Sequence, residues 1–182
     1  AMAIIDFPLI HPDALQWYLK ANSQAFTSPL SGTTQTLSQP GERWTARLDF
    51  RNRRGEEKAQ LKAFITRLRG AAGRFRLCNF DQPTPRGLAT GTPLVDGAGQ
   101  IGTALISKGW TPSIGGILLA GDFFAVGTAL NLVVADVNSD ELGNATLTFE
   151  PPPRAAPAAA TATVLERPTP LLLLTDDQPS GL

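Results

Sequence analysis

The sequence has little of the side-chain chemistry on which most enzymes depend. Its 182 residues include one histidine, His11, and one cysteine, Cys78. A single cysteine excludes a disulfide within the chain, and one cysteine with one histidine cannot supply the four ligands of a usual zinc site. We interpret His11, between Ile10 and Pro12, as a surface or packed histidine, and Cys78 as a small buried side chain. No cofactor and no metal ion is therefore expected.

Motifs of catalysis and nucleotide binding are missing or misplaced. The sequence contains no Gly-x-Ser-x-Gly nucleophile turn and no Walker loop. Residues 97–102 satisfy G-x-G-x-x-G literally, but a dinucleotide loop must open a helix, and the following residues before Gly109 and Pro112 do not favour one. Asp136, Asp140 and Glu141 lack the spacing of an EF-hand and are typical of a soluble hairpin loop. The chain is predicted not to be an enzyme.

Long hydrophobic runs are also absent. No segment approaches the roughly 20 apolar residues of a membrane-spanning helix, because glycine or charge interrupts both Leu171–Leu174 and Gly115–Gly127. The hydrophobic content of 42% is nevertheless enough for a folded core. At this length we expect one large domain or two small ones, with no part in the membrane.

The charge is balanced overall but divided along the chain. Residues 43–86 hold twelve of the sixteen Lys and Arg and four of the sixteen Asp and Glu, a net charge of +8, which leaves −8 in the remainder. The segment is either a solvated basic face or one of two complementary surfaces that meet between subunits. Nucleic-acid binding is a third interpretation, although no known binding module accompanies the arginines.

The first 83 residues predict a small β module with one helix. Residues 3–30 indicate an opening strand and one further strand or an irregular arm, and 33–37 alternate weakly. Residues 43–50 alternate strictly between apolar and polar side chains, which predicts a half-buried strand. Phe75–Phe80 is predicted as another strand.

A helix is predicted over residues 56–69. Leu61, Phe64, Ile65 and Leu68 recur at the spacing of one helical stripe. The stripe favours packing against a sheet, and Gly70 is placed to end the helix as the C′ residue.

Beyond residue 83, glycine and proline separate short apolar runs about 8–12 residues apart, which is typical of a small barrel or sandwich. The final segments Thr163–Leu165 and Leu171–Thr175 also indicate strands. The last of these has no obvious partner among its neighbours, so we expect it to return to the first module. The other expected strands are Leu94–Val95, Ile101–Ile106, Ile117–Leu119, Phe123–Val126, Leu130–Val137 and Ala145–Phe149.

Two sets of short motifs carry a family resemblance. The first comprises Gln39-Pro40-Gly41-Glu42-Arg43-Trp44, Leu61-Lys62-Ala63-Phe64 and Gly73-Arg74-Phe75-Arg76-Leu77. The second comprises Gly109-Trp110, Leu119-Ala120-Gly121-Asp122-Phe123-Phe124-Ala125-Val126-Gly127, Ala135-Asp136-Val137-Asn138-Ser139-Asp140, Gly143-Asn144-Ala145-Thr146-Leu147 and Glu150-Pro151-Pro152-Pro153-Arg154. Over about residues 39–154 the chain resembles the distal tail proteins of long-tailed, siphovirus-like bacteriophages and prophages.

The resemblance implies a mainly β fold: a tail-tube-like β-sandwich with one packed α-helix, plus a small inserted β-barrel that is OB-like in certain members. Combined with the strand pattern, it places the ring-forming sandwich at 1–83 and 163–182, with the helix at 56–69. The inserted all-β barrel is expected at 84–162.

The same resemblance implies a structural protein of the virion tail, assembled in the bacterial cytoplasm. Its implied partners are further copies in a homohexameric ring, the tail tube protein, and a tail-tip or baseplate hub protein. DNA would meet the protein only by passing through the ring lumen. Because interfaces favour Trp and Arg, the candidate subunit contacts are Arg43, Trp44, Arg47, Arg51, Arg53 and Arg54.

Two alternatives stay open from the residues. The chain could be a tail tube, terminator or other minor tail protein. From a different class, its second module could bind carbohydrate or single-stranded nucleic acid, which requires exposed aromatic side chains. Only Trp110, Phe123 and Phe124 are candidates for that platform.

Overall fold

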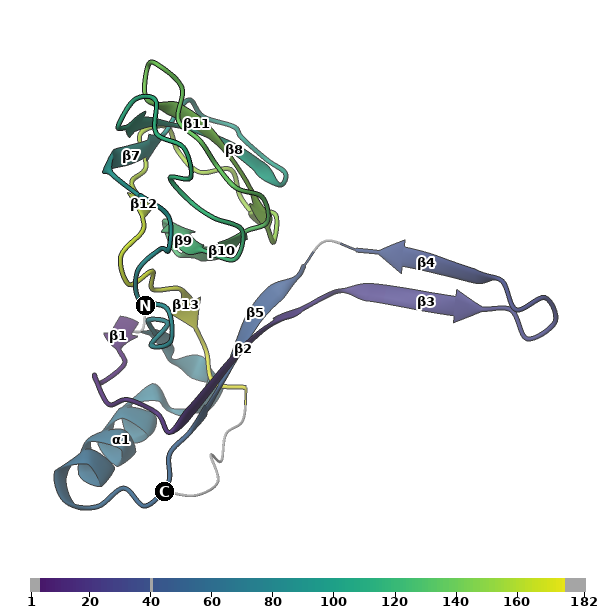
Figure 1. Ribbon diagram of the computed structural model, residues 1–182. Coiled ribbons are helices and arrows are strands. Elements are labelled where there is room, and N and C mark those ends of the chain that lie inside the picture. The colour runs from purple at the N-terminus through teal and green to yellow at the C-terminus, as the bar shows by residue number, and fades with distance from the viewer. Residues whose placement is uncertain (1–3, 40, 176–182) are drawn as a thin grey trace.

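The computed structural model describes residues 4–39 and 41–175, and it is mainly β with one α-helix among them. Figure 1 shows three parts: a small module that carries the helix, a β-barrel, and a two-stranded ribbon that ends in a long projecting hairpin. The mainly β class with one helix is confirmed.

A three-stranded sheet forms the helix module. β6 (Arg74–Arg76) lies between β1 (Ile4–Asp6), which is parallel to it, and β13 (Leu171–Leu172), which is antiparallel. The final strand thus pairs in the helix module. We expected this because the sequence offers it no obvious partner among its neighbours. It is shorter than the expected Leu171–Thr175.

The helix α1 spans Gly55–Leu68, one residue earlier at each end than expected. Leu61, Phe64 and Leu68 are buried, which confirms the predicted stripe. The phenyl rings of Phe64 and Phe75 meet edge to face at 5.4 Å, so the stripe packs on β6. The helix ends where Arg69 adopts the left-handed conformation, and Gly70 follows with positive φ.

The ribbon consists of β2 (Ala14–Lys20) and β5 (Arg43–Asp49), which are antiparallel over seven paired residues. Its continuation is the hairpin of β3 (Ser23–Thr27) and β4 (Thr34–Ser38). The sequence pattern at 3–30 predicted an opening strand and one further strand or an irregular arm, whereas the described part of this stretch holds three strands, β1, β2 and β3.

The barrel is a six-stranded sheet in the order β12-β9-β10-β11-β8-β7. A bridge between Leu94 and Ala162 nearly closes it. Its interior holds Phe124 and Phe149, whose rings meet edge to face at 5.4 Å. The strands are β7 (Gly91–Val95), β8 (Ala104–Trp110), β9 (Phe123–Val126), β10 (Ala129–Val133), β11 (Asn144–Glu150) and β12 (Thr163–Val164).

Several expected strands differ from the observed ones. The strand expected over Phe75–Phe80 ends at Arg76, although residues 77–79 are buried, because they pack as a loop and the Asn79 side chain accepts the backbone N–H of Asp81. Residues 117–119 contribute one isolated bridge rather than a strand. β12 pairs with β9, so Thr163 and Val164 belong to the barrel. They had been expected in the second segment of the ring-forming sandwich, 163–182.

Among the described residues, no helix is long and apolar enough to cross a membrane.

Candidate assembly surfaces

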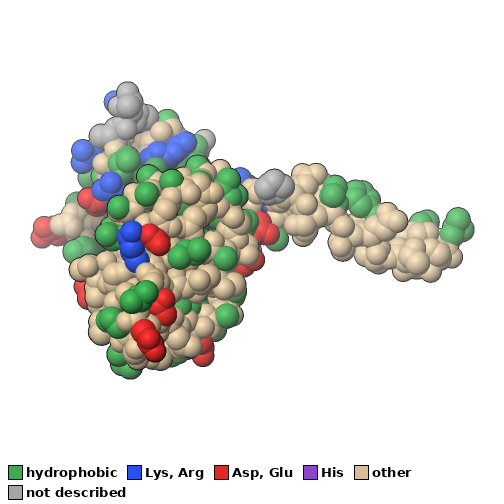
Figure 2. All heavy atoms as spheres, turned by 90° about the horizontal axis from the view of Figure 1, so that it is seen from above, with side chains coloured by type: hydrophobic (Ala, Val, Ile, Leu, Met, Phe, Trp, Pro, Cys, Tyr) green, Lys and Arg blue, Asp and Glu red, His purple; other side chains and the backbone are tan. Residues whose placement is uncertain are grey.

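The most unusual surface is the projecting hairpin at 21–39, which we call the arm. Every arm residue is exposed except the half-buried Ser28, and Figures 1 and 2 show it reaching away from the rest of the chain. Leu30 at the tip is 98% exposed, Phe26 58% and Leu37 48%. The arm therefore presents apolar surface that this chain does not cover.

The arm also contains no Asp, Glu, Lys or Arg. Monomeric proteins usually protect exposed strand edges with charges, proline or bulges, because an unpaired edge can add a strand from another molecule. Both edges of β3–β4 lack a strand partner among the described residues, and the one proline, Pro29, lies in the tip outside the strands. The arm thus has the composition of a strand pair meant to be covered.

The two faces of the arm differ. Cross-strand partners project to the same side of a sheet, so the pairs Gln24–Leu37 and Phe26–Gln35 share one face. Phe26 and Leu37 are diagonal neighbours there and form an apolar patch, which we call the Phe26 face. The opposite face carries only small side chains: Ser23, Ala25, Thr27, Thr34, Thr36 and Ser38.

The arm bends where it leaves the ribbon. Between the paired segments the outgoing strand has residues 21 and 22, whereas the return strand has 39–42. The pairing resumes at Gln39, whose backbone N–H donates to the carbonyl of Asn22 at 2.9 Å. Gly41 has a φ of +125°, a conformation that other residues rarely adopt.

A second surface is a groove of about 1540 Å³ between the ribbon, the helix module and the barrel. All residues from 42 to 51 line it, but β2 contributes only Tyr18, so it runs along the edge of β5 that faces away from β2. Residues 170–175 line it as well, and β13 is the edge strand of its own sheet. Phe64 and Ile65 of α1 are among the apolar lining residues.

The six predicted interface residues do not all face solvent. Trp44 is half-buried within its own chain: its Nε1–H donates to the carbonyl of Leu130 at 2.9 Å, and its ring lies 5.4 Å from that of Phe123. Trp44 therefore joins the ribbon to the barrel, a contact that sequence alone did not reveal.

Arg53 is likewise occupied within the chain. Its guanidinium contacts Asp13 at 3.2 Å and Glu57 at 3.3 Å, and it donates to the carbonyl of His11 at 2.7 Å. These contacts tie the segment before the ribbon to the start of the helix. The predicted candidates that are exposed are Arg43, Arg47, Arg51 and Arg54.

A buried carboxylate that the sequence analysis did not single out fixes the segment leading into the barrel. The Asp122 side chain is 0% exposed, and its oxygens accept the backbone N–H groups of Leu119, Arg86 and Gly87. The guanidinium of Arg86 and the amide of Gln82 also donate to it. Burial favours the neutral form, but the hydrogen bonds outweigh it, so the pKa of Asp122 lies below its ordinary value.

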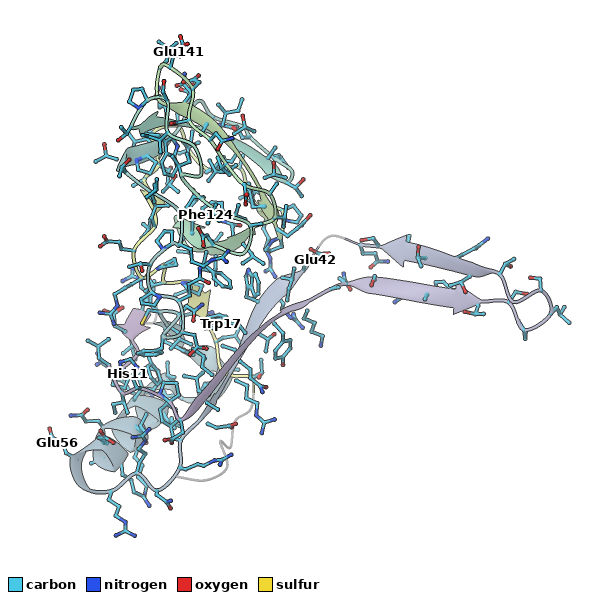
Figure 3. All side chains as sticks on the ribbon, viewed as in Figure 1. His11, Trp17, Glu42, Glu56, Phe124 and Glu141 are labelled. Carbon is cyan, nitrogen blue, oxygen red and sulfur yellow. The ribbon has the colours of Figure 1, made fainter. Side chains whose placement is uncertain are left out.

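Two carboxylates interact where the ribbon meets the barrel. Glu42 precedes β5 at the base of the arm, labelled in Figure 3, and Glu150 ends β11. Burial, and then the charge of Glu42, raises the pKa of the Glu150 carboxyl above its ordinary value.

The remaining polar candidates serve the fold. The ring of His11 packs against Phe80 at 4.8 Å. Asp140 accepts the backbone N–H groups of Leu142 and Asn144, which closes the hairpin loop before β11. No group of three His, Cys, Asp or Glu that could hold a metal ion occurs within residues 4–39 and 41–175.

The aromatic candidates for a binding platform lie inside. Trp110 is buried, with its Nε1–H donating to Ser107, and Phe124 is buried in the barrel. Phe123 packs on Trp44. A base or sugar ring thus has none of these three side chains available for stacking.

No family model matches this chain, and no curated protein sequence matches it.

Proposed function

We propose that this protein is a structural subunit of a long-tailed bacteriophage tail, a distal tail protein that forms a ring between the tail tube and the tail tip or baseplate. The observation that carries the proposal is the arm: a charge-free β-hairpin with exposed apolar side chains that its own chain leaves uncovered. The tail assignment itself rests on the motif resemblance over residues 39–154.

An isolated two-stranded hairpin is marginal in water. Keeping Phe26, Leu30 and Leu37 in solvent forfeits the stabilisation of about 1.5–3 kcal/mol that full burial of such a side chain provides. Contact with other subunits recovers this energy, which accounts for an arm that would otherwise be a liability for aggregation.

The charge distribution supports a head-to-tail arrangement. The basic segment 43–86 includes β5 and α1, whereas the barrel carries several exposed acids, including Asp136, Asp140 and Glu141. On the face that Figure 2 shows, most of the visible Lys and Arg lie toward one side and many of the visible Asp and Glu lie over the other. A contact that repeats between different faces of identical subunits closes into a ring when its rotation allows.

The finer fold follows the same proposal. The helix module with the ribbon corresponds to a tube-like β-sandwich, split in sequence and completed by β13. The six-stranded barrel corresponds to the inserted OB-like domain and lies beyond the helix module in Figure 1.

The mass of the purified full chain tests this proposal. We expect sedimentation velocity to give a closed species of six subunits whose size does not grow with concentration. A tail tube protein, the alternative within the class, would instead form polymers that lengthen with concentration. A monomer at every concentration contradicts the proposal.

A matched variant removes the arm but keeps the ribbon. Residues 21–42 are replaced by a two-residue Asn-Gly turn between the paired residues Lys20 and Arg43, which suits a β-hairpin. We expect this variant to fold and to stay monomeric, because the arm contacts nothing that the ribbon needs. Full assembly of the armless variant would show that the arm is not the contact.

A further inference from the structure

We propose that the arm of one copy occupies the groove of the next, as an added pair of strands between β5 and the segment 170–175. This inference rests on the proposed ring function and names the two surfaces that form its contact. It places the donor and the acceptor on different faces of the same chain, as a closed ring requires.

Both walls of the groove include strand edges to which a further hairpin can pair. One wall is the edge of β5, whose backbone pairs only with β2 in the described structure. The other wall is the segment 170–175, which includes the edge strand β13. A hairpin laid between them would present one free strand edge to the backbone N–H and C=O groups of each wall, except at Leu171, whose N–H donates to the carbonyl of Thr128 at 3.3 Å.

The floor of the groove suits the Phe26 face. Among the lining residues, Phe64 and Ile65 project from α1, and Leu48 from β5. These apolar side chains match Phe26 and Leu37, which the arm presents side by side. The opposite face of the arm, which carries small and mostly hydroxyl side chains, would then point outward.

The absence of charge on the arm fits this occupant. Moving an ionised side chain from water to an apolar floor costs several kcal/mol unless a partner is present. A strand that enters the groove must therefore be neutral on its inner face, and residues 21–39 contain no ionised side chain on either face.

The donor must be another copy. The arm leaves the ribbon beyond Lys20 and Arg43 and extends away from the body (Figures 1 and 3), whereas the groove lies along the ribbon itself. The hydrogen bond from Trp44 to Leu130 closes the arm-proximal end of β5 against the barrel. The hairpin cannot fold back into its own groove without breaking this contact.

Cross-linking between two differently marked chains tests the docking. Both chains carry Cys78→Ser; one carries Phe26→Cys and the other Leu173→Cys, which lies in the groove wall and is 43% exposed. The control acceptor is Leu142→Cys, 84% exposed in the hairpin loop at the far end of the barrel. After mixing and oxidation, we expect a disulfide-linked pair with Leu173→Cys at least tenfold more abundant than with Leu142→Cys.

Substitutions test whether assembly depends on the two proposed docking surfaces. Phe26→Lys and Leu173→Lys should each abolish or strongly reduce assembly, whereas Thr36→Lys on the outer face of the arm and Leu142→Lys should assemble as the unaltered protein does. Circular dichroism controls for folding, because all four positions are exposed.

The outcomes are distinct. If the unaltered chain never assembles, the ring function fails. If it assembles while Phe26→Cys links equally to both acceptors, or to neither, the ring stands and the docking in the groove is wrong. If Thr36→Lys disrupts assembly and Phe26→Lys does not, the wrong face of the arm has been assigned.

Discussion

The indole N–H of Trp44 donates a hydrogen bond of 2.9 Å to the carbonyl oxygen of Leu130, and this bond links the ribbon to the barrel across 86 positions of sequence. Replacing Trp44 with Phe keeps an aromatic ring beside Phe123 but removes the donor. We expect the free energy of unfolding to fall by about 1 kcal/mol. Trp44→Ala also removes the ring and should cost about 3 kcal/mol or more.

Urea denaturation of the arm-deleted monomer measures both effects without interference from assembly. Trp17→Phe on β2 is the matched control, because the Trp17 Nε1 is buried without a hydrogen-bond partner in the described structure. It therefore isolates the change in ring size. Equal losses for Trp17→Phe and Trp44→Phe would show that the bond to Leu130 adds nothing.

Elements with a strong local period were predictable. The helix follows from the stripe Leu61, Phe64 and Leu68, because its spacing needs no knowledge of the partner surface. The strand at 123–126 was predicted with its observed bounds, since Gly121-Asp122 precedes and Gly127 follows the apolar run. In both cases a pattern within the segment itself was sufficient to predict the element.

The arm, and the contacts of Trp44 and Asp122 with distant segments, could not be predicted from local sequence patterns. Residues 23–38 expose both faces of a ribbon, so no alternation of apolar and polar side chains marks the strands. Trp44 gave the signal of an interface residue, but its contact is with a distant segment of its own chain. Asp122 lies in a Gly-Asp sequence that reads as a turn, and its partners at Arg86 and Gly87 follow only from the three-dimensional fold.

Asp122 should be a principal stabiliser of the barrel entry. Asp122→Ala leaves the N–H groups of Leu119, Arg86 and Gly87 without their acceptor. Since each unsatisfied buried donor costs about 1–3 kcal/mol, we expect a loss of at least about 3 kcal/mol in the free energy of unfolding. A loss below about 1 kcal/mol in urea denaturation would contradict this role.

The same residue predicts an acid-sensitive contribution. The pKa of Asp122 is lowered in the folded state, so its ionisation stabilises the fold above the ordinary value of 3.8, and this stabilisation is lost as the pH falls through the folded pKa. Asp122→Asn should therefore be less stable than the unaltered chain at pH 7, with the difference shrinking toward pH 3. A difference that does not change between these pH values would refute the charged role.

Glu150 predicts the opposite sign. Its raised pKa means that the folded state favours the protonated carboxyl, so the associated stability is present below the ordinary value of 4.5 and is lost as the pH rises through the folded pKa. Glu150→Gln should raise the melting temperature at pH 7, by up to about 2 °C, and leave it unchanged near pH 4. Glu42→Gln should recover only part of this gain, because burial is the larger cause.

Salt should weaken assembly without abolishing it. Raising NaCl from 0.1 M to 1 M shortens the Debye length from about 10 Å to about 3 Å, which screens the attraction between the basic and acidic segments. The neutral arm is unaffected, so we expect the dissociation constant between subunits to rise by about tenfold or less.

Charge reversal checks the source of that salt effect. Arg47→Glu changes an exposed predicted contact residue on β5 and should reduce the salt dependence of assembly, whereas Lys62→Glu on the exposed side of α1 should not. An identical salt dependence in all three proteins would remove the argument from charge.

Electron microscopy of the purified full chain in negative stain tests the central claim most directly. The account predicts closed rings with six-fold symmetry and an open lumen, and it predicts that deletion of the arm eliminates them. Monomers without rings at high protein concentration, or rings that persist unchanged without the arm, would contradict it.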